Sequence, residues 1–467
     1  MRAFKTAVTA SAVGALVAVG GATANATSGG PDPEPLVSLE QTAEDLWELY
    51  EETGQIDDPL PLDSIPGAGD ESVPDEVQEL ANRLWEDAPA GFGDVEWNPA
   101  TRDVTLYWHG TVDAEVQADV ATIATPVHFE SMEYSRETLA ENAQASLEID
   151  GVVMAAGRAD GSGLELTIDS QVQSRRATPD AQAISTSLPD PSIPVEITLG
   201  DAPTQAVDDR DTPSAPYPGG ARIKINSSTQ GMIKLCSSGF PVLIDPPYVP
   251  GAGSTYGMAF AAHCTAGVGA NPYWSPRASN YFFGTQNPAH YNKSSVDLAV
   301  LVNSSSVSGV ELPNKIYFPY LFVGPNAGAS RYIIDGTAAP IIGVNWCTSG
   351  APSGTHCGAT INSTSIYVDY GQDMFENVGP LVRTQTNDGL RTVGQGDSGG
   401  PAHRINADGQ PFARSAGILS GIQGGTANSC WQSNDGRLCS NIALISPLPV
   451  LMDALNIRAM TAHNYKE

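Results

Sequence analysis

Three short segments far apart in the sequence hold the residue types needed for covalent hydrolysis. His263 ends an apolar run, Asp297 precedes the apolar stretch 298–300, and Ser398 lies in the glycine-rich segment 394–401. A serine hydroxyl is a poor nucleophile at neutral pH, so it needs a base that takes its proton and a group that orients the base. The three residues therefore predict a serine nucleophile activated by histidine, with aspartate holding the imidazole in the required tautomer.

The glycines around Ser398 indicate where the negative charge of a tetrahedral intermediate would be held. Gly396 precedes the serine by two positions, and Gly399 and Gly400 follow it directly. Residues without side chains let the backbone N–H groups of Gly396 and Ser398 point at one position, which we predict to be the oxyanion hole. Removing one donor from such a hole typically costs about 2.7–4 kcal/mol.

The segments AAHC, DLAV and GDSGGP, in the order His, Asp, Ser, resemble the chymotrypsin-type serine proteases. The resemblance covers about residues 219–457. It implies an all-β catalytic domain of two six-stranded barrels with a C-terminal helix, in which His263 and Asp297 come from the first barrel and Ser398 from the second. It also implies a serine endopeptidase that acts on protein or peptide substrates without a cofactor or metal.

Within that family, the segments Trp346–Gly350 and His356–Gly358 are similar to the secreted bacterial branch of streptogrisins and α-lytic protease. Members of that branch carry prosegments that help the catalytic domain fold. By this resemblance, Cys236 would pair with Cys264 and Cys347 with Cys357. Residues 391–395 lack the cysteine that usually precedes the nucleophile, so Cys430 is expected to pair locally with Cys439.

The aspartate before the nucleophile, Asp397, needs a cation, because a buried and unpaired carboxylate is costly. The bacterial branch commonly supplies an arginine directly after the first cysteine of the Cys347 pair, but this chain has Thr348 there. Two candidates remain open from the sequence. One is Arg331, and the other is a new amino terminus made by cleavage before the catalytic domain.

Substrate preference is read from two segments that resemble the walls of the primary pocket. Ser420-Gly421-Ile422 resembles the strand that pairs with the substrate backbone, and Ile422 stands where glycine is common. Thr392 stands where trypsin-like members carry an aspartate at the base of the pocket. A branched side chain narrows the pocket and threonine offers no charge, so we predict cleavage after small or medium apolar residues.

The start of the chain and its cysteines predict export. Residues 1–26 combine two basic residues, an apolar run and Ala24-Asn25-Ala26, which is the pattern of a cleaved signal peptide. All six cysteines follow residue 235, and an even number in an exported chain favours disulfides over metal ligands. We therefore expect a secreted, extracellular protein without a bound metal.

Charge divides the chain into two different parts. Residues 1–216 contain 40 acidic and 9 basic residues, whereas residues 217–467 contain 13 and 14. An acidic surface repels nucleic acid and anionic membranes, so neither is an expected partner. We expect a monomer whose own acidic N-terminal part is its main intramolecular partner.

Periodicity predicts the organisation of that acidic part. Helical stripes run over 38–50 and after Pro74, two hairpins are expected near 95–108 and 152–168, and a late helix is expected over 447–457. We therefore predict a signal peptide (1–26), an acidic α+β prosegment (27–170), a proline-rich linker (171–218) and the catalytic domain (219–467). The prosegment would act as a chaperone and an inhibitor of the catalytic domain.

Two other functions stay open at this point. One is a non-catalytic binding protein on the same fold, although an intact set of His263, Asp297 and Ser398 argues against it. The other is a protease whose residues 27–216 stay attached as a permanent substrate-binding or inhibitory domain.

Overall fold

The computed structural model describes most of the chain from residue 73 onwards. The described residues are 65, 73–169, 184–200, 217–227, 231–244, 255–265, 273–276, 283–292, 296–302, 317–324, 329–370, 377–405, 412–427, 430–431, 436–462 and 464. The predicted signal peptide and the predicted helix over 38–50 lie outside these residues.

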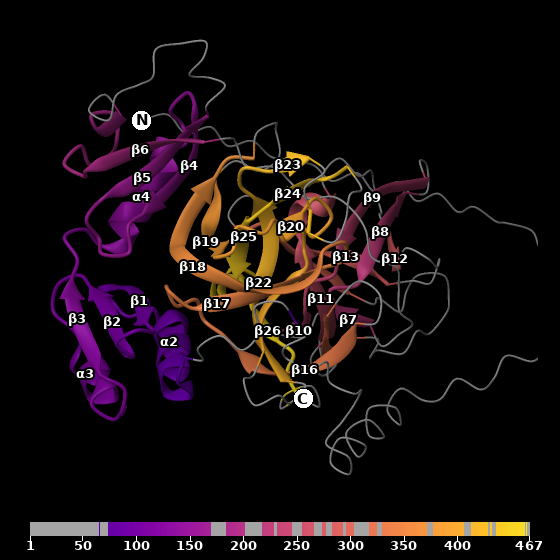
Figure 1. Ribbon diagram of the computed structural model, residues 1–467, viewed down its shortest axis with the longest axis horizontal. Helices are drawn as coiled ribbons and strands as arrows, with labels where there is room; N and C mark the ends of the chain where they lie inside the picture. The colour runs from indigo at the N-terminus through magenta and orange to yellow at the C-terminus, as the bar shows by residue number, and fades with distance from the viewer. Residues whose placement is uncertain are drawn as a thin grey trace, which may run out of the picture.

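The N-terminal unit mixes helices and strands (indigo to magenta in Figure 1). Its strands β1 and β2 form the first predicted hairpin and β4 and β5 the second, while β3 pairs in parallel with β2. The elements are α2 (Asp75–Asp87), β1 (Phe92–Asn98), β2 (Asp103–Trp108), α3 (Ala114–Val120), β3 (Val127–Ser131), α4 (Arg136–Ser146), β4 (Val152–Gly157), β5 (Leu164–Asp169) and β6 (Val195–Gly200).

Helix α2 forms for reasons that are visible in its sequence. Pro74 directly precedes it, and Asp75 and Glu76 place negative charge in its first turn, where the helix dipole favours it. Its apolar stripe is buried against the rest of the protein, and the helix ends at Ala88 in the left-handed conformation. The buried residues of the stripe are Val77, Leu80, Ala81, Leu84 and Trp85.

Residues 184–200 are folded onto the N-terminal unit, which corrects their assignment to an extended linker. Strand β6 pairs in parallel with β5, and Ile184, Leu188 and Ile193 are buried in the core around those strands. The prolines precede the strand and leave its alternating pattern uninterrupted, so composition alone concealed it. The rest of the predicted linker, 170–183 and 201–216, lies outside the described residues.

The first part of the chain after residue 216 forms an eight-stranded antiparallel sheet in the order β26-β10-β11-β14-β13-β12-β8-β9. Strand β26, at one edge of this sheet, comes from near the C-terminal end of the chain and pairs with β10. The strands are β8 (Arg222–Ser227), β9 (Gly231–Ser237), β10 (Pro241–Ile244), β11 (Thr255–Ala261), β12 (Tyr273–Pro276), β13 (Gly284–Asn292), β14 (Leu298–Val302) and β26 (Ile457–Ala459).

The second half contains a closed barrel of six antiparallel strands. The ring runs β18-β17-β21-β22-β25-β19 and returns to β18, because each strand pairs with both of its neighbours. Helix α7 (Leu448–Leu455) follows β25 and leads into β26. The barrel strands are β17 (Asn345–Gly350), β18 (Gly354–Val368), β19 (Val378–Thr386), β21 (Pro401–Ile405), β22 (Phe412–Ile422) and β25 (Ile442–Pro447).

Six further strands among the described residues lie outside the barrel: β16, β15 and β7 extend its sheet beyond β22, and β20, β24 and β23 form a separate three-stranded sheet. They are β7 (Tyr217–Gly219), β15 (Tyr317–Val323), β16 (Ser330–Thr337), β20 (Val393–Gly394), β23 (Thr426–Ala427) and β24 (Leu438–Ser440). The predicted fold class is confirmed: a β-barrel region with a C-terminal helix follows a unit of helices and strands, and of the two predicted six-stranded barrels the described residues close one, the other half being the eight-stranded sheet.

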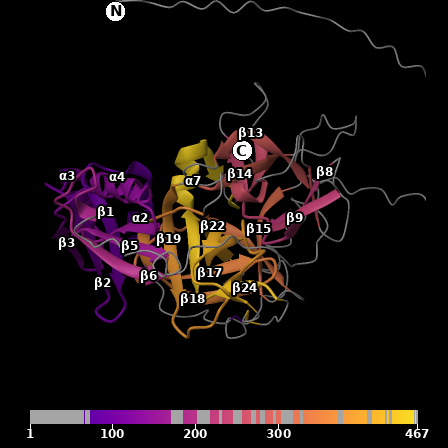
Figure 2. The ribbon, with the colours of Figure 1, turned by 90° about the horizontal axis from the view of Figure 1, so that it is seen from above.

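The N-terminal unit is joined to the barrel through the sheet. Strand β4 pairs antiparallel with the outer end of β18, with Ala156 opposite Ile366 and Met154 opposite Val368. Both views place the unit beside β18 and β19 (Figures 1 and 2). The sheet of the unit and that of the barrel are therefore continuous.

Helix α2 makes a second set of contacts with the barrel side. Asn82 donates from Nδ2 to the carbonyl of Thr337 over 3.1 Å and accepts the N–H of Ala339 over 2.7 Å. Gln78 donates to the carbonyl of Ala339 and accepts from Arg404 over 2.6 Å. Apolar residues of α2, β1 and β2 also share one core cluster with residues 338–346, so the two parts bury a common interface.

Candidate active site

The register of two strands brings His263 next to Asp297. Strand β11 pairs with β14 so that Ala261 lies opposite Leu298. His263 follows β11 in the short 3-10 helix η2 (Ala262–Thr265), and Asp297 directly precedes β14. The N–H of Ala262 donates to the carbonyl of Asp297 over 3.2 Å, which fixes the two strand ends together.

The three predicted side chains meet. The Nδ1 of His263 lies 2.7 Å from Oδ2 of Asp297, and its Nε2 lies 2.8 Å from Oγ of Ser398. Asp297 and Ser398 have no exposed surface and His263 is 3% exposed. With the proton on Nδ1, the imidazole donates to the carboxylate, and its Nε2 lone pair accepts the serine hydroxyl.

Asp297 is held by more than the imidazole. Its Oδ1 accepts the backbone N–H of His263 over 2.9 Å, and its Oδ2 accepts the hydroxyl of Ser420 over 2.5 Å. The Ser420 hydroxyl is in turn 2.9 Å from the hydroxyl of Tyr370. Asp297 adopts a left-handed backbone conformation with φ of 48°, which is uncommon for a residue with a side chain.

Ser398 sits in a loop between β20 and β21 that is tied to the first sheet. Its carbonyl accepts the N–H of Ser237 over 2.9 Å, and the hydroxyl of Ser237 donates to the carbonyl of Gly396 over 2.8 Å. Gly399 has φ of 84°, and a Cβ there would lie 2.5 Å from the Ser237 carbonyl oxygen. Glycine is therefore required at position 399 by both conformation and space.

An oxyanion hole at Ser398 needs backbone N–H groups that are not already bonded to a backbone carbonyl. Around Ser398, the N–H groups of Asp397, Gly399 and Gly400 each donate to a backbone carbonyl. Within the part of the chain that the structure describes, the N–H of Gly396 donates to no backbone carbonyl. Gly396 has φ of 103°, a conformation that favours glycine.

The cation beside Asp397 in the intact chain is Arg437, a residue that was not among the candidates taken from the sequence. Nη1 of Arg437 lies 3.7 Å from Oδ2 of Asp397, and both side chains are almost fully buried. Ser353 donates from Oγ to Oδ2 over 2.6 Å, and the N–H of Gly394 donates to the same oxygen over 2.7 Å. Burial raises the pKa of Asp397, and the charge of Arg437 opposes that shift.

The predicted pocket residues lie around the same site. Ser420, Gly421 and Ile422 form the end of β22, and Thr392 directly precedes β20; all four are buried. A Cβ on Gly421 would collide with the ring of Tyr370, since it would lie 2.5 Å from the phenol oxygen. The side chain of Ser420 contacts Asp297, while Ile422 and the neighbour of Thr392, Val393, belong to one apolar cluster.

The three predicted disulfides are present, and they join Cys236 to Cys264, Cys347 to Cys357 and Cys430 to Cys439. The first ties the end of β9 to η2, directly after His263. The third closes the segment that carries Arg437. Both bonds therefore restrain residues of the site itself.

Comparison with known proteins gives matches among solved structures only. One match is described as a glutamic acid-specific serine protease, with 20% identity, coverage of 52% of this chain and 100% of that chain, and a TM-score of 0.35. Thermobifida fusca Protease A has 21% identity over 52% of this chain and 98% of its own, with a TM-score of 0.34. Cellulomonas bogoriensis chymotrypsin has 22% identity over the same shares, with a TM-score of 0.32.

These similar structures are all proteases by name. No protein-family model matches the chain, and no curated protein matches it. The geometry of His263, Asp297 and Ser398 therefore carries the functional argument.

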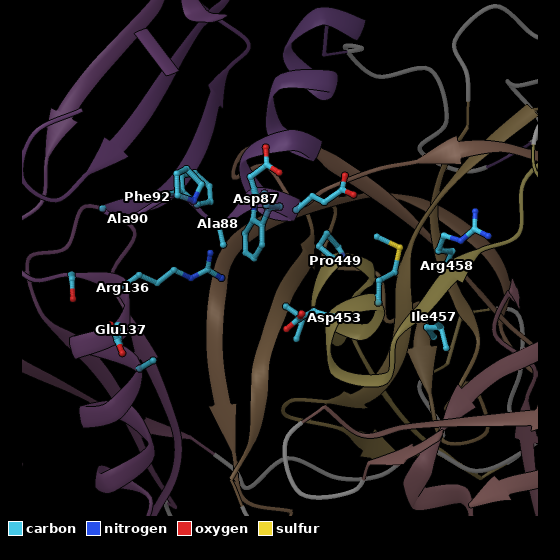
Figure 3. Close-up of a pocket in the computed structure, with 18 residues that line it drawn as sticks. Asp87, Ala88, Ala90, Phe92, Arg136, Glu137, Pro449, Asp453, Ile457 and Arg458 are labelled. Carbon is cyan, nitrogen blue, oxygen red and sulfur yellow. The ribbon is translucent and has the colours of Figure 1, made fainter. Parts of the chain in front are cut away.

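A cavity of about 880 Å³ lies away from that site, between the N-terminal unit and helix α7 (Figure 3). Trp85, Phe92 and Arg136 face it from the unit, and Pro449 and Asp453 face it from α7. The guanidinium of Arg136 lies 4.0 Å from the ring centre of Trp85, which is cation–π geometry. The cavity belongs to the interface between the two parts.

The described residues contain neither a metal-binding cluster nor a membrane-spanning helix. No cluster of three or more His, Cys, Asp and Glu side chains among them is arranged to hold a metal ion. None of the helices in the described part of the chain has the length and apolar character needed to span a membrane.

Proposed function

We propose that this protein is a secreted serine endopeptidase made as a proenzyme, which cleaves peptide bonds through an acyl-enzyme. The observation that carries the proposal is the chain of two short contacts, 2.7 Å from Asp297 to His263 and 2.8 Å from His263 to Ser398. Side chains 34 and 135 residues apart in sequence meet in the order that nucleophilic hydrolysis requires.

The residues would act in two half-reactions. Oγ of Ser398 attacks the substrate carbonyl while its proton moves to Nε2 of His263, and the N–H groups of Gly396 and Ser398 receive the oxyanion. His263 then gives the proton to the departing amine, which leaves an ester on Ser398. A water molecule, deprotonated by the same imidazole, attacks the ester and releases the acid. Asp297 stays ionised and stabilises the imidazolium in both steps.

The burial of the site supports a latent form. A reacting carbonyl has to come within about 3–3.5 Å of the nucleophile. Ser398 has no exposed surface and His263 is 3% exposed, so neither reacting side chain is open to solvent in this conformation. We propose that the N-terminal unit, which adds strands to β18 and binds through α2, acts as a prosegment that chaperones and restrains the catalytic region.

For the substrate, we propose a preference for small or medium apolar residues before the cleaved bond. The preference rests on the sequence resemblance, in which the branched side chain of Ile422 narrows the primary pocket and Thr392 supplies no charge at its base. Among p-nitroanilide peptides, those ending in alanine, valine or leucine should be cut faster than those ending in arginine or glutamate. Faster cleavage after a charged residue would contradict this preference.

Secretion and removal of the N-terminal unit are also part of this proposed function. Secretion is supported by the three disulfides, which persist in oxidising compartments. A permanently attached regulatory unit stays the alternative to a removable prosegment. N-terminal sequencing of protein from the culture medium separates them, because a removed unit gives a start after residue 200.

Hydrolysis by the secreted wild type and by Ser398→Ala tests the enzyme against the competing binding-protein function. We expect peptide hydrolysis by the wild type and a loss of at least about 10⁴-fold in kcat for the variant. Mass spectrometry of both products adds a second readout, because a precursor that accumulates only in the variant indicates self-processing. Equal hydrolysis by the two proteins would contradict the proposal.

A further inference from the structure

We propose that Arg437 is a positioning residue of the oxyanion hole, which fixes the peptide between Gln395 and Gly396 so that the Gly396 N–H faces the reacting carbonyl. The inference rests on the proposed hydrolysis at Ser398 and names a residue that the family motifs do not contain.

The guanidinium of Arg437 reaches two groups of the loop before the nucleophile and one serine, Ser353, which itself binds that loop. Nη1 donates to the carbonyl of Gln395 over 3.0 Å and lies 3.7 Å from the carboxylate of Asp397. Nη2 donates to the hydroxyl of Ser353 over 3.1 Å, and that hydroxyl donates to Asp397. Arg437 is 5% exposed, so these bonds form where water competes little.

Holding the Gln395 carbonyl also sets the direction of the next N–H. The peptide bond is planar and trans, so the carbonyl of Gln395 and the N–H of Gly396 lie in one rigid plane and point in opposite directions. With its carbonyl directed at Arg437, the peptide turns the Gly396 N–H away from Arg437. Rotation of that plane would remove the donor from the oxyanion hole.

An external anchor is needed here because the backbone at Gly396 is permissive. Glycine populates both signs of φ at similar cost, and Gly396 sits at φ of 103°. Its own carbonyl is held from the other side by the hydroxyl of Ser237, over 2.8 Å. Arg437 and Ser237 therefore fix the two peptides that flank Gly396.

The segment that carries Arg437 is itself fastened to this loop. The N–H of Gln395 donates to the carbonyl of Leu438 over 2.9 Å, and the N–H of Leu438 donates to Oε1 of Gln395 over 3.1 Å. Cys439 pairs in register with Gly394 and is joined to Cys430. A side chain at Gly394 would collide with Sγ of Cys439, so the glycine leaves space for the disulfide.

The geometry requires arginine and not only a positive charge. A planar guanidinium can donate to Gln395 and Ser353 from separate nitrogens while it neutralises Asp397. A lysine ammonium at the same position keeps the charge but lacks the fixed fork. Arg437→Lys therefore separates neutralisation of Asp397 from orientation of the peptide.

The test measures kcat and KM of the full secreted protein for one p-nitroanilide peptide, with wild type, Arg437→Met, Arg437→Lys and Arg331→Met in the same covalent form. We expect Arg437→Met to lower kcat about 100-fold, as loss of one oxyanion donor does, with KM changed by less than about threefold. Arg437→Lys should lower kcat about tenfold, as part of the same loss. The matched control Arg331→Met should keep the wild-type kcat.

Added guanidinium chloride at millimolar concentration provides a readout that a purely structural role would not move. It should restore part of kcat in Arg437→Met, whereas sodium chloride should not, and the thermal midpoint should stay unchanged by either salt. If Arg437→Met does not fold, Arg437→Lys decides. A wild-type kcat in Arg437→Lys or in Arg437→Met overturns this inference alone, whereas a wild type without Ser398-dependent hydrolysis overturns the proposed function and this inference together.

Discussion

At the residue scale, the carboxylate of Asp297 determines how the imidazole is oriented. It accepts the N–H of His263, the hydroxyl of Ser420 and the ring proton on Nδ1 while fully buried. A buried carboxylate that accepts several hydrogen bonds is held in one direction. The ring of His263 is thereby held with Nε2 toward Ser398.

The hydroxyl of Ser420 should therefore contribute to catalysis through Asp297. Ser420→Ala removes a hydrogen bond to a charged group, which contributes about 1.5–3 kcal/mol, and we expect kcat to fall roughly tenfold or more. Tyr370→Phe is the matched control, because it removes only the outer hydroxyl and should change kcat less than about threefold. Steady-state kinetics on one peptide substrate measures both, and an unchanged kcat in Ser420→Ala would contradict this role.

Some residues of the site could be predicted from the sequence, and others could not. His263, Asp297 and Ser398 could be predicted because each sits in a short motif, whereas the cysteine pairs followed from the family resemblance. Arg437 could not, because it acts on Gln395 and Asp397 across some 40 residues through side-chain contacts alone. Its place between Cys430 and Cys439 was the one available signal, since that disulfide borders the nucleophile loop.

At the element scale, strands β1 and β18 meet through a buried carboxylate. Asp94 on β1 accepts the hydroxyl of Thr364 on β18 and the N–H of Val95. Burial raises the pKa of Asp94 to about 6, while the nearby charge of Arg136 opposes the shift. This acid therefore binds its proton more tightly in the folded protein than in the unfolded chain.

The sign of this shift predicts a pH dependence of stability. Between pH of about 4 and about 6 the folded state binds more protons at Asp94 than the unfolded state does, so stability falls as the pH rises through that range. A shift of about two pKa units corresponds to at most about 3 kcal/mol. Above pH of about 6 this contribution is constant.

Urea unfolding of wild type and Asp94→Asn at pH 4 and pH 7 measures the effect. Other acids titrate in both proteins, so the difference between them isolates position 94. We expect the free energy of unfolding of the wild type, relative to Asp94→Asn, to be lower at pH 7 than at pH 4. If the free energy of unfolding of the wild type relative to Asp94→Asn were the same at both pH values, or higher at pH 7 than at pH 4, the raised pKa of Asp94 would be contradicted.

Most helices and strands of the N-terminal unit could be predicted from periodicity, but strand β6 could not. Helix α2 and the hairpins β1–β2 and β4–β5 follow from periodicity, because their apolar faces repeat regularly. Strand β6 was missed because prolines surround it, although Val195, Ile197 and Leu199 alternate within it. The parallel pairing of β6 with β5 depends on the whole unit and has no local signature.

At the scale of the whole molecule, the two parts of the chain share one core and one sheet. The charge difference between the halves predicted two units, but it gave no sign of how they dock. Docking uses backbone pairing of β4 with β18 and the side chains of α2, which are specific to the folded surfaces. The cavity beside α7 shows that packing across this interface is incomplete (Figure 3).

Asn82 offers a direct probe of this docking in the intact chain. Its side chain accepts the N–H of Ala339 and donates to Thr337, so Asn82→Ala removes two hydrogen bonds across the interface, worth about 0.5–1.5 kcal/mol each, and one within α2 to Gln78. Hydrogen exchange of the Ala339 amide should become roughly 5- to 100-fold faster. Asn362→Ala is the matched control within the barrel and should leave that amide unchanged; equal protection in both variants would place the docking contact elsewhere.

Labelling of the secreted protein with a fluorophosphonate, followed by mass spectrometry of the digested product, tests whether Ser398 is a nucleophile activated by His263 and Asp297. We expect one label per chain, located on Ser398, with no label in Ser398→Ala and slow labelling in His263→Ala. A label on another residue, or equal labelling of wild type and Ser398→Ala, would contradict it.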